Sequence, residues 1–336
     1  MRTRTRALQE RIHVKLSVIV PFYNVQAYAP DTLRSLAANT RPDFEFVLVD
    51  DCSTDGTLAV LEQYARTLPG AVVVRPERNR GLAGARNVGL EAARGEYLTF
   101  LDGDDWISAG YLERLVGAVE RHGCDFVRVD HVQVTGVKRQ VQKAPQARRD
   151  EVLDPRDGIL PADRATMVDY PYAWAGVYHR RLLERGALHF DEGLRTAEDR
   201  PWIWRLHRLA DSYAVTGLRG VHYRRAVATS LTQVGDERQL DFIRAFDLVL
   251  EQLADDPDAE LLLPKAVRTY CAVLVHHRRN ADRLERDVAR RLRTLSAEAL
   301  RRMPQHHLAD ALDAMDAERA AVIRRLRGSL TAVGAR

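Results

Sequence analysis

The chain has 336 residues and a formal net charge of +4, long enough for one large α/β domain and a helical addition. Acidic residues nearly match basic ones, which argues against a nucleic-acid-binding protein, because such proteins concentrate positive charge. The three cysteines, Cys52, Cys124 and Cys271, are too widely spaced for a disulfide framework or a zinc site with paired ligands.

The first part of the chain alternates strand-like and helix-like segments, the pattern of a mostly parallel sheet with flanking helices. Buried apolar runs predict strands over residues 16–21, 44–49, 71–75, 96–101 and 125–129. Segments between them predict helices over residues 31–38, 57–67, 84–93 and 109–122. Asp31 is expected to be the N-cap of the first of these helices.

The pattern changes in the second part of the chain. Apolar periodicity disappears over residues 133–160, which predicts a long, mobile surface connection. Strands are expected over 170–178 and 215–223, with a helix over 201–209 between them. The predicted organisation is a disordered N-terminal arm, an α/β domain and a helical C-terminal domain, with boundaries at 1–13, 14–238 and 239–336.

Two neighbouring strands of the predicted sheet end in polar residues. The first ends in Pro21-Phe22-Tyr23-Asn24 and the second in Asp50-Asp51. The carboxyl ends of parallel strands form the natural ligand crevice where strand order reverses. Asp50 or Asp51 can accept hydrogen bonds from a ribose or a base there, with helix capping as the structural alternative. No G-x-G-x-x-G follows the first strand, so a dinucleotide cofactor is not expected.

The fourth predicted strand ends in Asp102-Gly103-Asp104-Asp105. Two carboxylates separated by one small residue can turn toward the same point and supply hard oxygen ligands to Mg²⁺ or Mn²⁺. A metal held there would neutralise the charge that develops on a departing diphosphate. A solvated turn would use the same residue types, so it is the position of these residues at the end of a strand that favours a metal site.

Two further segments carry candidate functional residues. Arg86 lies in 79–87, which opens a helix, and its guanidinium can reach a phosphate or a base; the alternative is an exposed arginine on an amphipathic helix. Glu198 and Asp199 precede Pro201, which is suited to start a helix. Adjacent side chains point apart, so at most one of the two acids can act as a general base; helix capping by Asp199 is the alternative.

Taken in order, these segments resemble the large inverting glycosyltransferase family 2 with its GT-A fold. The resemblance covers residues 14–235 and rests on five segments, 17–24, 49–56, 79–87, 101–105 and 198–199. The arrangement, with helices after the transferase domain, is similar to that of soluble wall-teichoic-acid and capsular-polysaccharide glycosyltransferases. It implies transfer of a sugar from a nucleotide sugar, UDP-linked, to a hydroxyl group of a cell-wall or surface glycopolymer.

The resemblance also implies roles for individual residues. The nucleotide-sugar site it implies comprises Pro21, Phe22, Tyr23, Asn24, Asp50, Asp51, Asn79, Arg86, Asp102, Gly103 and Arg224. Pro21, Tyr23 and Asp51 would surround the nucleobase and ribose. Asp102 and Asp104 would form the D-x-D pair, with Asp104 as the direct ligand of Mn²⁺ or Mg²⁺. Asp199 of the Glu198-Asp199 pair would be the catalytic base.

Further expectations concern the end of the last strand and one departure from the family. His222 is expected to complete the metal shell or contact the diphosphate, and Arg224 or Arg225 to bind phosphate. Cys52 stands where the family usually has glycine or another small residue, and we expect the turn to tolerate it. No Gln-x-x-Arg-Trp motif and no membrane-spanning stretch occur, which argues against a processive membrane synthase.

The partners expected from the sequence are a nucleotide-sugar donor and a glycan or anionic glycopolymer acceptor, with no nucleic acid. The arginine-rich stretch 278–293 suits an anionic polymer, although a solvated helix face explains it equally well. A cytoplasmic location is expected, with peripheral contact at the inner face of the membrane and self-association through the C-terminal helices as further hypotheses. A nucleotidyltransferase and a non-catalytic carbohydrate-binding protein with a degenerate transferase fold stay open as alternatives.

Overall fold

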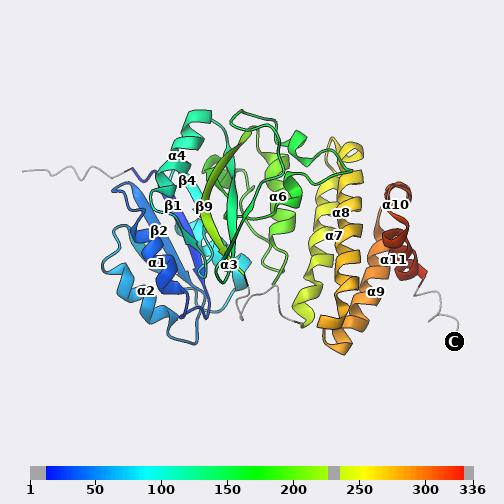
Figure 1. The fold of residues 1–336 in the computed structure, drawn as a ribbon, viewed down its shortest axis with the longest axis horizontal. Coiled ribbons are helices and arrows are strands. Elements are labelled where there is room, and N and C mark those ends of the chain that lie inside the picture. Colours follow the sequence, from blue (N-terminus) through cyan, green and yellow to red (C-terminus); the bar gives the residue numbers. More distant parts are fainter. Residues whose placement is uncertain (1–12, 226–234, 329–336) are drawn as a thin grey trace, which may run out of the picture.

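The computed structural model describes residues 13–225 and 235–328. The predicted N-terminal arm, 1–13, therefore lies outside the described residues except for His13. The protein consists of a nine-stranded sheet with helices packed around it and a group of helices at the C-terminal end (Figure 1). This confirms the predicted class, a mostly parallel α/β sheet with flanking helices followed by a helical C-terminal region.

One half of the sheet is entirely parallel. Its strands are β1 (Leu16–Phe22), β2 (Phe44–Asp50), β3 (Ala71–Val74) and β4 (Tyr97–Phe100), in the order β3-β2-β1-β4. The connecting helices are α1 (Ala29–Ala37), α2 (Thr57–Ala65) and α3 (Gly81–Ala92). Because the chain adds β2 and β3 on one side of β1 and β4 on the other, strand order reverses between β1 and β4. Ligands bind beside such a reversal, at the carboxyl ends of the strands.

The other half of the sheet is mixed. It contains β5 (Trp106–Ile107), β6 (Phe126–Thr135), β7 (Lys138–Gln142), β8 (Gly176–His179) and β9 (Tyr213–Arg224). The order continues from β4 through β8, β6 and β9 to β5, with β7 paired to β6. The shorter elements and helices of this half are α4 (Tyr111–His122), η1 (Arg156–Ile159), η2 (Met167–Asp169), α5 (Arg181–Glu184) and α6 (Asp199–Leu209).

The predicted mobile connection over 133–160 was wrong in its first part. Strand β6 continues to Thr135 and turns at Gly136, which has a positive φ of 56°, into β7. Strand β7 has the sequence Lys-Arg-Gln-Val-Gln, and four of its five residues are exposed. An exposed edge strand needs no buried apolar face. Because the residues of β7 are mostly polar or charged, apolar periodicity could not reveal this strand.

Two other expectations also need correction. Asp31 is not the N-cap of α1, which begins two residues earlier after Tyr28, with Pro30 in its first turn. Proline is favoured there because its missing N–H would have no helical partner anyway. The strand expected over 170–178 is confined to β8, because the preceding residues form η2 and a compact aromatic cluster that includes Tyr170, Tyr172 and Trp174.

The C-terminal region is helical, as expected from its apolar periodicity. Its elements are η3 (Glu237–Leu240), α7 (Asp241–Ala254), α8 (Ala259–Arg279), η4 (Ala281–Arg283), α9 (Arg286–Arg302), α10 (Gln305–Asp313) and α11 (Ala317–Gly328). Helix α7 runs beside α6, α8 packs against α7, and α9 to α11 lie beyond them (Figure 1). A separate buried cluster holds these helices together, but Val249 and Leu262 belong to the core of the α/β part. No helix within the described ranges is both long and apolar enough to cross a membrane.

Candidate active site

The loops that follow β1 and β2 are joined by hydrogen bonds. The backbone N–H of Asn24 donates to Ser53 Oγ at 3.1 Å, and the N–H of Thr54 donates to Asn24 Oδ1 at 2.8 Å. Asn24 adopts a left-handed φ of 53°, which asparagine tolerates better than most residues. Tyr23, 49% exposed, presents its ring beside these loops, whereas Phe22 is buried in the core. Of these two predicted site residues, only Tyr23 is open to a ligand.

Asp51 caps the helix that follows β3. Its Oδ1 accepts the N–H of Arg80 at 2.7 Å and its Oδ2 accepts the N–H of Gly81 at 2.8 Å, at the start of α3. Burial raises the pKa of Asp51, and these two hydrogen bonds oppose the rise. The capping alternative is therefore observed, although each carboxylate oxygen keeps a second acceptor site. Asn79 reinforces the junction by donating from Nδ2 to the Asp51 carbonyl at 2.8 Å.

Asp50 and Cys52 flank this cap and have structural partners. The Asp50 carboxylate is buried, 3.3 Å from Arg75 Nε. Cys52 adopts a φ of 60°, the left-handed conformation in which glycine carries no strain, and its thiol donates to the carbonyl of Pro76 at 3.3 Å. The turn accepts cysteine, as expected, and its conformation explains a preference for glycine at this position.

The loop after β4 packs directly against the end of β1. A Cβ on Gly103 would lie 2.6 Å from the Phe22 ring and 2.7 Å from the Pro21 carbonyl oxygen, so only glycine fits without movement. Thr32 of α1 donates its hydroxyl to the carbonyls of Gly103 and Asp105, at 2.9 and 2.6 Å. Asp102 and Asp104 are therefore held at the strand reversal between β1 and β4.

The Asp104 carboxylate has the environment of a cation ligand. Burial raises its pKa to about 6, and repulsion by Asp102 adds to the rise. No side chain within the described residues donates a hydrogen bond to it. Two partly buried carboxylates that repel one another, one of them without a side-chain donor among the described residues, fit a hard divalent cation such as Mn²⁺ or Mg²⁺.

The structure does not bring His222 into this pair. Its Nε2 lies 3.0 Å from Ser108 Oγ, and its ring stacks on Trp106 with the ring centroids 5.3 Å apart. Among the described residues, three ligand atoms converge within 4.8 Å only at Glu260, His306 and His307, in the C-terminal helices. The metal shell expected from His222 together with Asp102 and Asp104 is thus not assembled.

Arg86 links the loop after β4 to the start of α6. Its side chain is only 4% exposed, and its Nη2 donates to Asp102 Oδ1 at 2.8 Å. Its Nη1 donates to Glu198 Oε1 at 2.7 Å, across 112 residues of sequence. The guanidinium also lies 5.1 Å from the centre of the Phe190 ring. The predicted contact of Arg86 with the nucleotide stays a prediction; its observed partners are two carboxylates.

Asp199 is the first residue of α6 and retains some exposed surface. The N-cap residue is Glu198, which makes no side-chain cap hydrogen bond, so capping by Asp199 is not observed, and the preceding Ala197 has a left-handed φ of 58°. Burial raises the pKa of Asp199 to about 7, and the charges of Glu198 and Asp102 also raise it, while Arg200 and Arg86 oppose the rise. Asp199 therefore belongs to the same charge cluster as the loop after β4.

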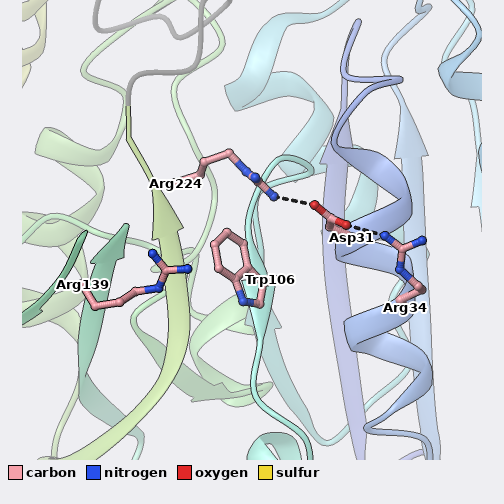
Figure 2. A pocket seen from close by; sticks show the side chains of 5 residues that line it. All are labelled: Asp31, Arg34, Trp106, Arg139 and Arg224. Carbon is pink, nitrogen blue, oxygen red and sulfur yellow. Dashed lines mark hydrogen bonds and ion pairs between the residues drawn. The ribbon is translucent and has the colours of Figure 1, made fainter. Parts of the chain in front are cut away.

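Sequence reasoning assigned Arg224 to the site but missed other residues that build it. Asp105 is buried and accepts the backbone N–H of Arg224 at 2.6 Å, and burial raises its pKa well above the usual range. Arg224 donates from Nε to the Asp104 carbonyl at 2.8 Å. It also borders a pocket with Asp31, Arg34, Trp106 and Arg139, shown in Figure 2. The one sequence feature that could have pointed to this pocket is that Trp106 directly follows the acidic residues of the loop after β4.

The amino-acid sequence matches the model of glycosyl transferase family 2 over residues 17–188. The chain belongs to this family. The uncharacterized glycosyltransferase EpsJ of Bacillus subtilis (strain 168) is 32% identical over 227 residues, which is 67% of this chain and 65% of EpsJ. The poly(ribitol-phosphate) beta-N-acetylglucosaminyltransferase TarS of Staphylococcus aureus (strain Mu50) is 32% identical over 213 residues, 62% of this chain and 35% of TarS. The chain thus spans less than two thirds of either relative.

Solved structures support the fold. TarS residues 1–349 in complex with UDP-GlcNAc align with a TM-score of 0.71 and 22% identity, covering 94% of this chain and 87% of that structure. The mannosyltransferase PcManGT from Pyrobaculum calidifontis, in complex with GDP-Man and Mn²⁺, aligns with a TM-score of 0.52 and 22% identity, covering 92% and 86%. At these identities the likeness concerns the fold, and it agrees with the GT-A architecture expected from the sequence.

Proposed function

We propose that this protein is an inverting glycosyltransferase that transfers a sugar from a UDP-linked donor to a hydroxyl group of a cell-wall or surface glycopolymer. The observation that carries the proposal is the Arg86 bridge between Asp102 and Glu198. It couples the predicted cation site to the start of α6, where the proposed base Asp199 lies. Family membership supports sugar transfer over nucleotidyl transfer and over a purely binding role.

The donor would bind at the strand reversal. The exposed Tyr23 ring offers a stacking surface for a base, and Asp51 keeps acceptor sites beside the start of α3. TarS, whose structure with UDP-GlcNAc shares this fold, motivates the choice of a UDP-sugar. The absence of a dinucleotide fingerprint in the sequence is consistent with a single nucleotide.

Asp104 and Asp102 would hold Mn²⁺ or Mg²⁺. The cation would supply positive charge to the departing diphosphate, so that no proton is needed there. Arg86 keeps Asp102 in place by a charge-assisted hydrogen bond, and Thr32 fixes the backbone of the same loop. The Mn²⁺ of PcManGT, a neighbour in fold, supports a metal-dependent reaction.

Asp199 would act as the general base. In the proposed step it accepts the proton of the acceptor hydroxyl while that oxygen forms a bond to the anomeric carbon. The bond from this carbon to the diphosphate oxygen breaks on the opposite face, which inverts the configuration and releases the nucleoside diphosphate. A carboxylate with a pKa of about 7 is a stronger base than an ordinary aspartate and is still mostly ionised above neutral pH.

A thermal-shift panel tests the donor assignment. Purified protein is heated with nucleoside diphosphates and common nucleotide sugars, with and without Mn²⁺. A metal-dependent rise in Tm with UDP and one UDP-sugar, absent with the adenine and guanine counterparts, is expected by mass action. The matched comparison is Asp104→Asn, which removes the proposed ligand and should abolish the metal dependence. Stabilisation by every nucleotide without metal would contradict the proposal.

A product assay tests the reaction. Glycosyl transfer releases a nucleoside diphosphate, whereas nucleotidyl transfer releases pyrophosphate, and the two products are separated by anion-exchange chromatography. Wild-type protein is expected to release UDP, and the anomeric configuration of the product is read by NMR. Retention of configuration would refute the inverting mechanism even if transfer occurs.

A further inference from the structure

A basic pocket lies beside the candidate active site. It has a volume of about 370 Å³ and is formed by Asp31 and Arg34 of α1, Trp106 of β5, Arg139 of β7 and Arg224 of β9. Figure 2 shows the Trp106 indole standing between Arg139 and Arg224, with Asp31 and Arg34 on the adjacent helix. Four elements from distant parts of the sequence thus contribute to one concave surface.

The pocket has an excess of positive charge. Its lining contains three guanidinium groups and one carboxylate. The carboxylate, Asp31, pairs with both Arg34 and Arg224, the latter at 3.0 Å. Within the described residues Arg139 has no carboxylate partner, and its Nη1 donates only to the carbonyls of Gly136 and Lys138. A phosphate group could accept hydrogen bonds from Arg139 and balance the remaining charge.

Trp106 adds an apolar surface to this charge. One contact of its ring is the parallel His222 ring, and Arg224 and Arg139 approach it with guanidinium carbons 4.6 and 5.9 Å from the ring centre. These stacked groups hold the indole in one orientation. Guanidinium groups around an aromatic ring suit a molecule that alternates phosphate with carbon-rich polyol or sugar units.

The position of the pocket favours the acceptor over the donor nucleotide. Strand β5 forms one edge of the sheet, whereas the nucleotide-site candidates Tyr23 and Asp51 follow β1 and β2 near the other edge. Trp106 directly follows the acidic loop, and Arg224 bonds the Asp104 carbonyl, so the pocket shares a wall with the predicted cation site. A polymer lying in it would pass close to the transferred sugar.

We infer that this pocket binds a phosphate group of an anionic, phosphate-linked polyol acceptor; the inference rests on the proposed function. Arg139 is the residue that most directly provides affinity, since it is exposed and free of carboxylates in the described structure. Arg224 has a second role, because it also holds the loop of the predicted cation site. Its substitution would therefore weaken donor binding and acceptor binding together.

Isothermal titration with a synthetic ribitol-phosphate oligomer tests this inference. Arg139→Gln is expected to weaken binding at least tenfold and to leave UDP binding unchanged, and uncharged ribitol should not bind. The matched control is Arg66→Gln, the same charge change at the end of α2, whose side chain is exposed and outside the pocket. Trp106→Phe, which keeps an aromatic ring, should give a smaller loss than Arg139→Gln.

The outcomes separate this inference from the proposed function. Equal affinity of Arg139→Gln and Arg66→Gln, or no binding of the oligomer to wild-type protein, would overturn the acceptor assignment while sugar transfer could still be demonstrated. Oligomer binding that depends on Arg139, combined with no UDP release from any nucleotide sugar, would uphold the pocket and overturn the proposed reaction.

A second inference concerns the C-terminal helices and rests on separate observations. Glu260 of α8 and His306 and His307 of α10 bring three ligand atoms within 4.8 Å of one another. Glu260 Oε2 lies 3.7 Å from His306 Nε2 and 3.5 Å from His307 Nε2. His307 is 5% exposed, and its Nε2 has no hydrogen-bond partner among the described residues, although it faces the carboxylate.

These distances suit a tetrahedral zinc ion. Ligand bonds of about 2.0–2.1 Å place neighbouring ligand atoms about 3.3–3.4 Å apart, slightly closer than they are here. We infer a zinc-binding site that connects the start of α8 to the start of α10, with a water molecule as fourth ligand.

Equilibrium dialysis against Zn²⁺, followed by elemental analysis, tests the site. His306→Ala is expected to bind one Zn²⁺ per chain fewer than the wild type, because other divalent-cation sites are unchanged. His189→Ala, at another exposed histidine, is the control and should keep the wild-type stoichiometry. Zn²⁺ should also raise the Tm of Asp104→Asn protein, which lacks the proposed catalytic ligand. Equal zinc content in the two alanine variants would overturn the inference.

Discussion

Replacement of Arg86 by methionine is expected to destabilise the protein strongly. The Arg86 side chain is 4% exposed, and it donates hydrogen bonds to Asp102 and to Glu198, whose side chain is 8% exposed. Removing one partner of a buried ion pair leaves an uncompensated charge and costs about 3–5 kcal/mol. That is a large share of the roughly 5–15 kcal/mol by which folded domains are stable.

Urea unfolding followed by circular dichroism measures this loss. A double variant supplies the internal check, because Glu198→Gln removes the more buried of the two charges that Arg86→Met leaves unpaired. Arg86→Met with Glu198→Gln is therefore expected to be more stable than Arg86→Met alone. A loss below about 1 kcal/mol in the single variant, typical of an exposed ion pair, would refute the reasoning that this bridge is buried and stabilising.

The same variant has a consequence for catalysis. Arg86 is one of the two cations that lower the pKa of Asp199, so its removal raises that pKa further. If Asp199 is the base, the rising limb of the kcat/KM profile should move to higher pH in any Arg86→Met protein that remains folded. Arg86→Lys keeps the positive charge and should move the limb less. An unchanged position of this limb would show that Asp199 is not the general base.

Three other predictions follow from the local structure. Asp199→Asn should lower transfer by about 10²–10⁴-fold with UDP binding retained, and wild-type kcat/KM should rise as pH passes about 7. Because the folded-state pKa of Asp199, about 7, lies above the unfolded value of about 4, the unfolded chain ionises first and stability falls as pH rises between these two values, so urea unfolding should show a larger advantage of Asp199→Asn over wild type at pH 8.5 than at pH 4. Gly103→Ala should weaken metal-dependent donor binding in thermal-shift assays, whereas Gly117→Ala, with nothing within 4 Å of the added Cβ, should leave it unchanged. Cys52→Gly should raise the free energy of unfolding by up to about 1 kcal/mol, because glycine carries no strain at this left-handed φ. A decrease of that size in the free energy of unfolding would show that the contact of the thiol with Pro76 outweighs the strain.

Much of the fold could be predicted from local sequence patterns. The strands that became β1 and β2 are buried on both faces and read as continuous apolar runs. The polar residues that follow them could be assigned to one edge of the sheet because parallel strands point the same way. Strand β7 could not be predicted, since its exposed residues lack an apolar face and only its pairing with β6 defines it.

The candidate site was less accessible to sequence reasoning, because its contacts join segments far apart in the chain. Asp102, Asp104 and Asp199 could be proposed from residue type and position. The contact of Arg86 with Glu198 spans 112 residues and depends on how α3 packs against the sheet. Gly89 of α3 permits that packing, since a Cβ there would lie 2.3 Å from Ile19. Sequence spacing carries no information about such an approach.

The two acids at the start of α6 point in different directions because of helix geometry. Consecutive residues of a helix point about 100° apart, so Glu198 can face the buried Arg86 while Asp199 stays partly exposed. Ala197 adopts its left-handed φ of 58° immediately before them, a conformation that costs an alanine about 1–2 kcal/mol. The ion pairs of Arg86 with Glu198 and Asp102 join the start of α6, where the proposed base lies, to the loop that would bind the cation. In the proposed in-line mechanism, this connection would help the base and the cation site to keep a fixed separation.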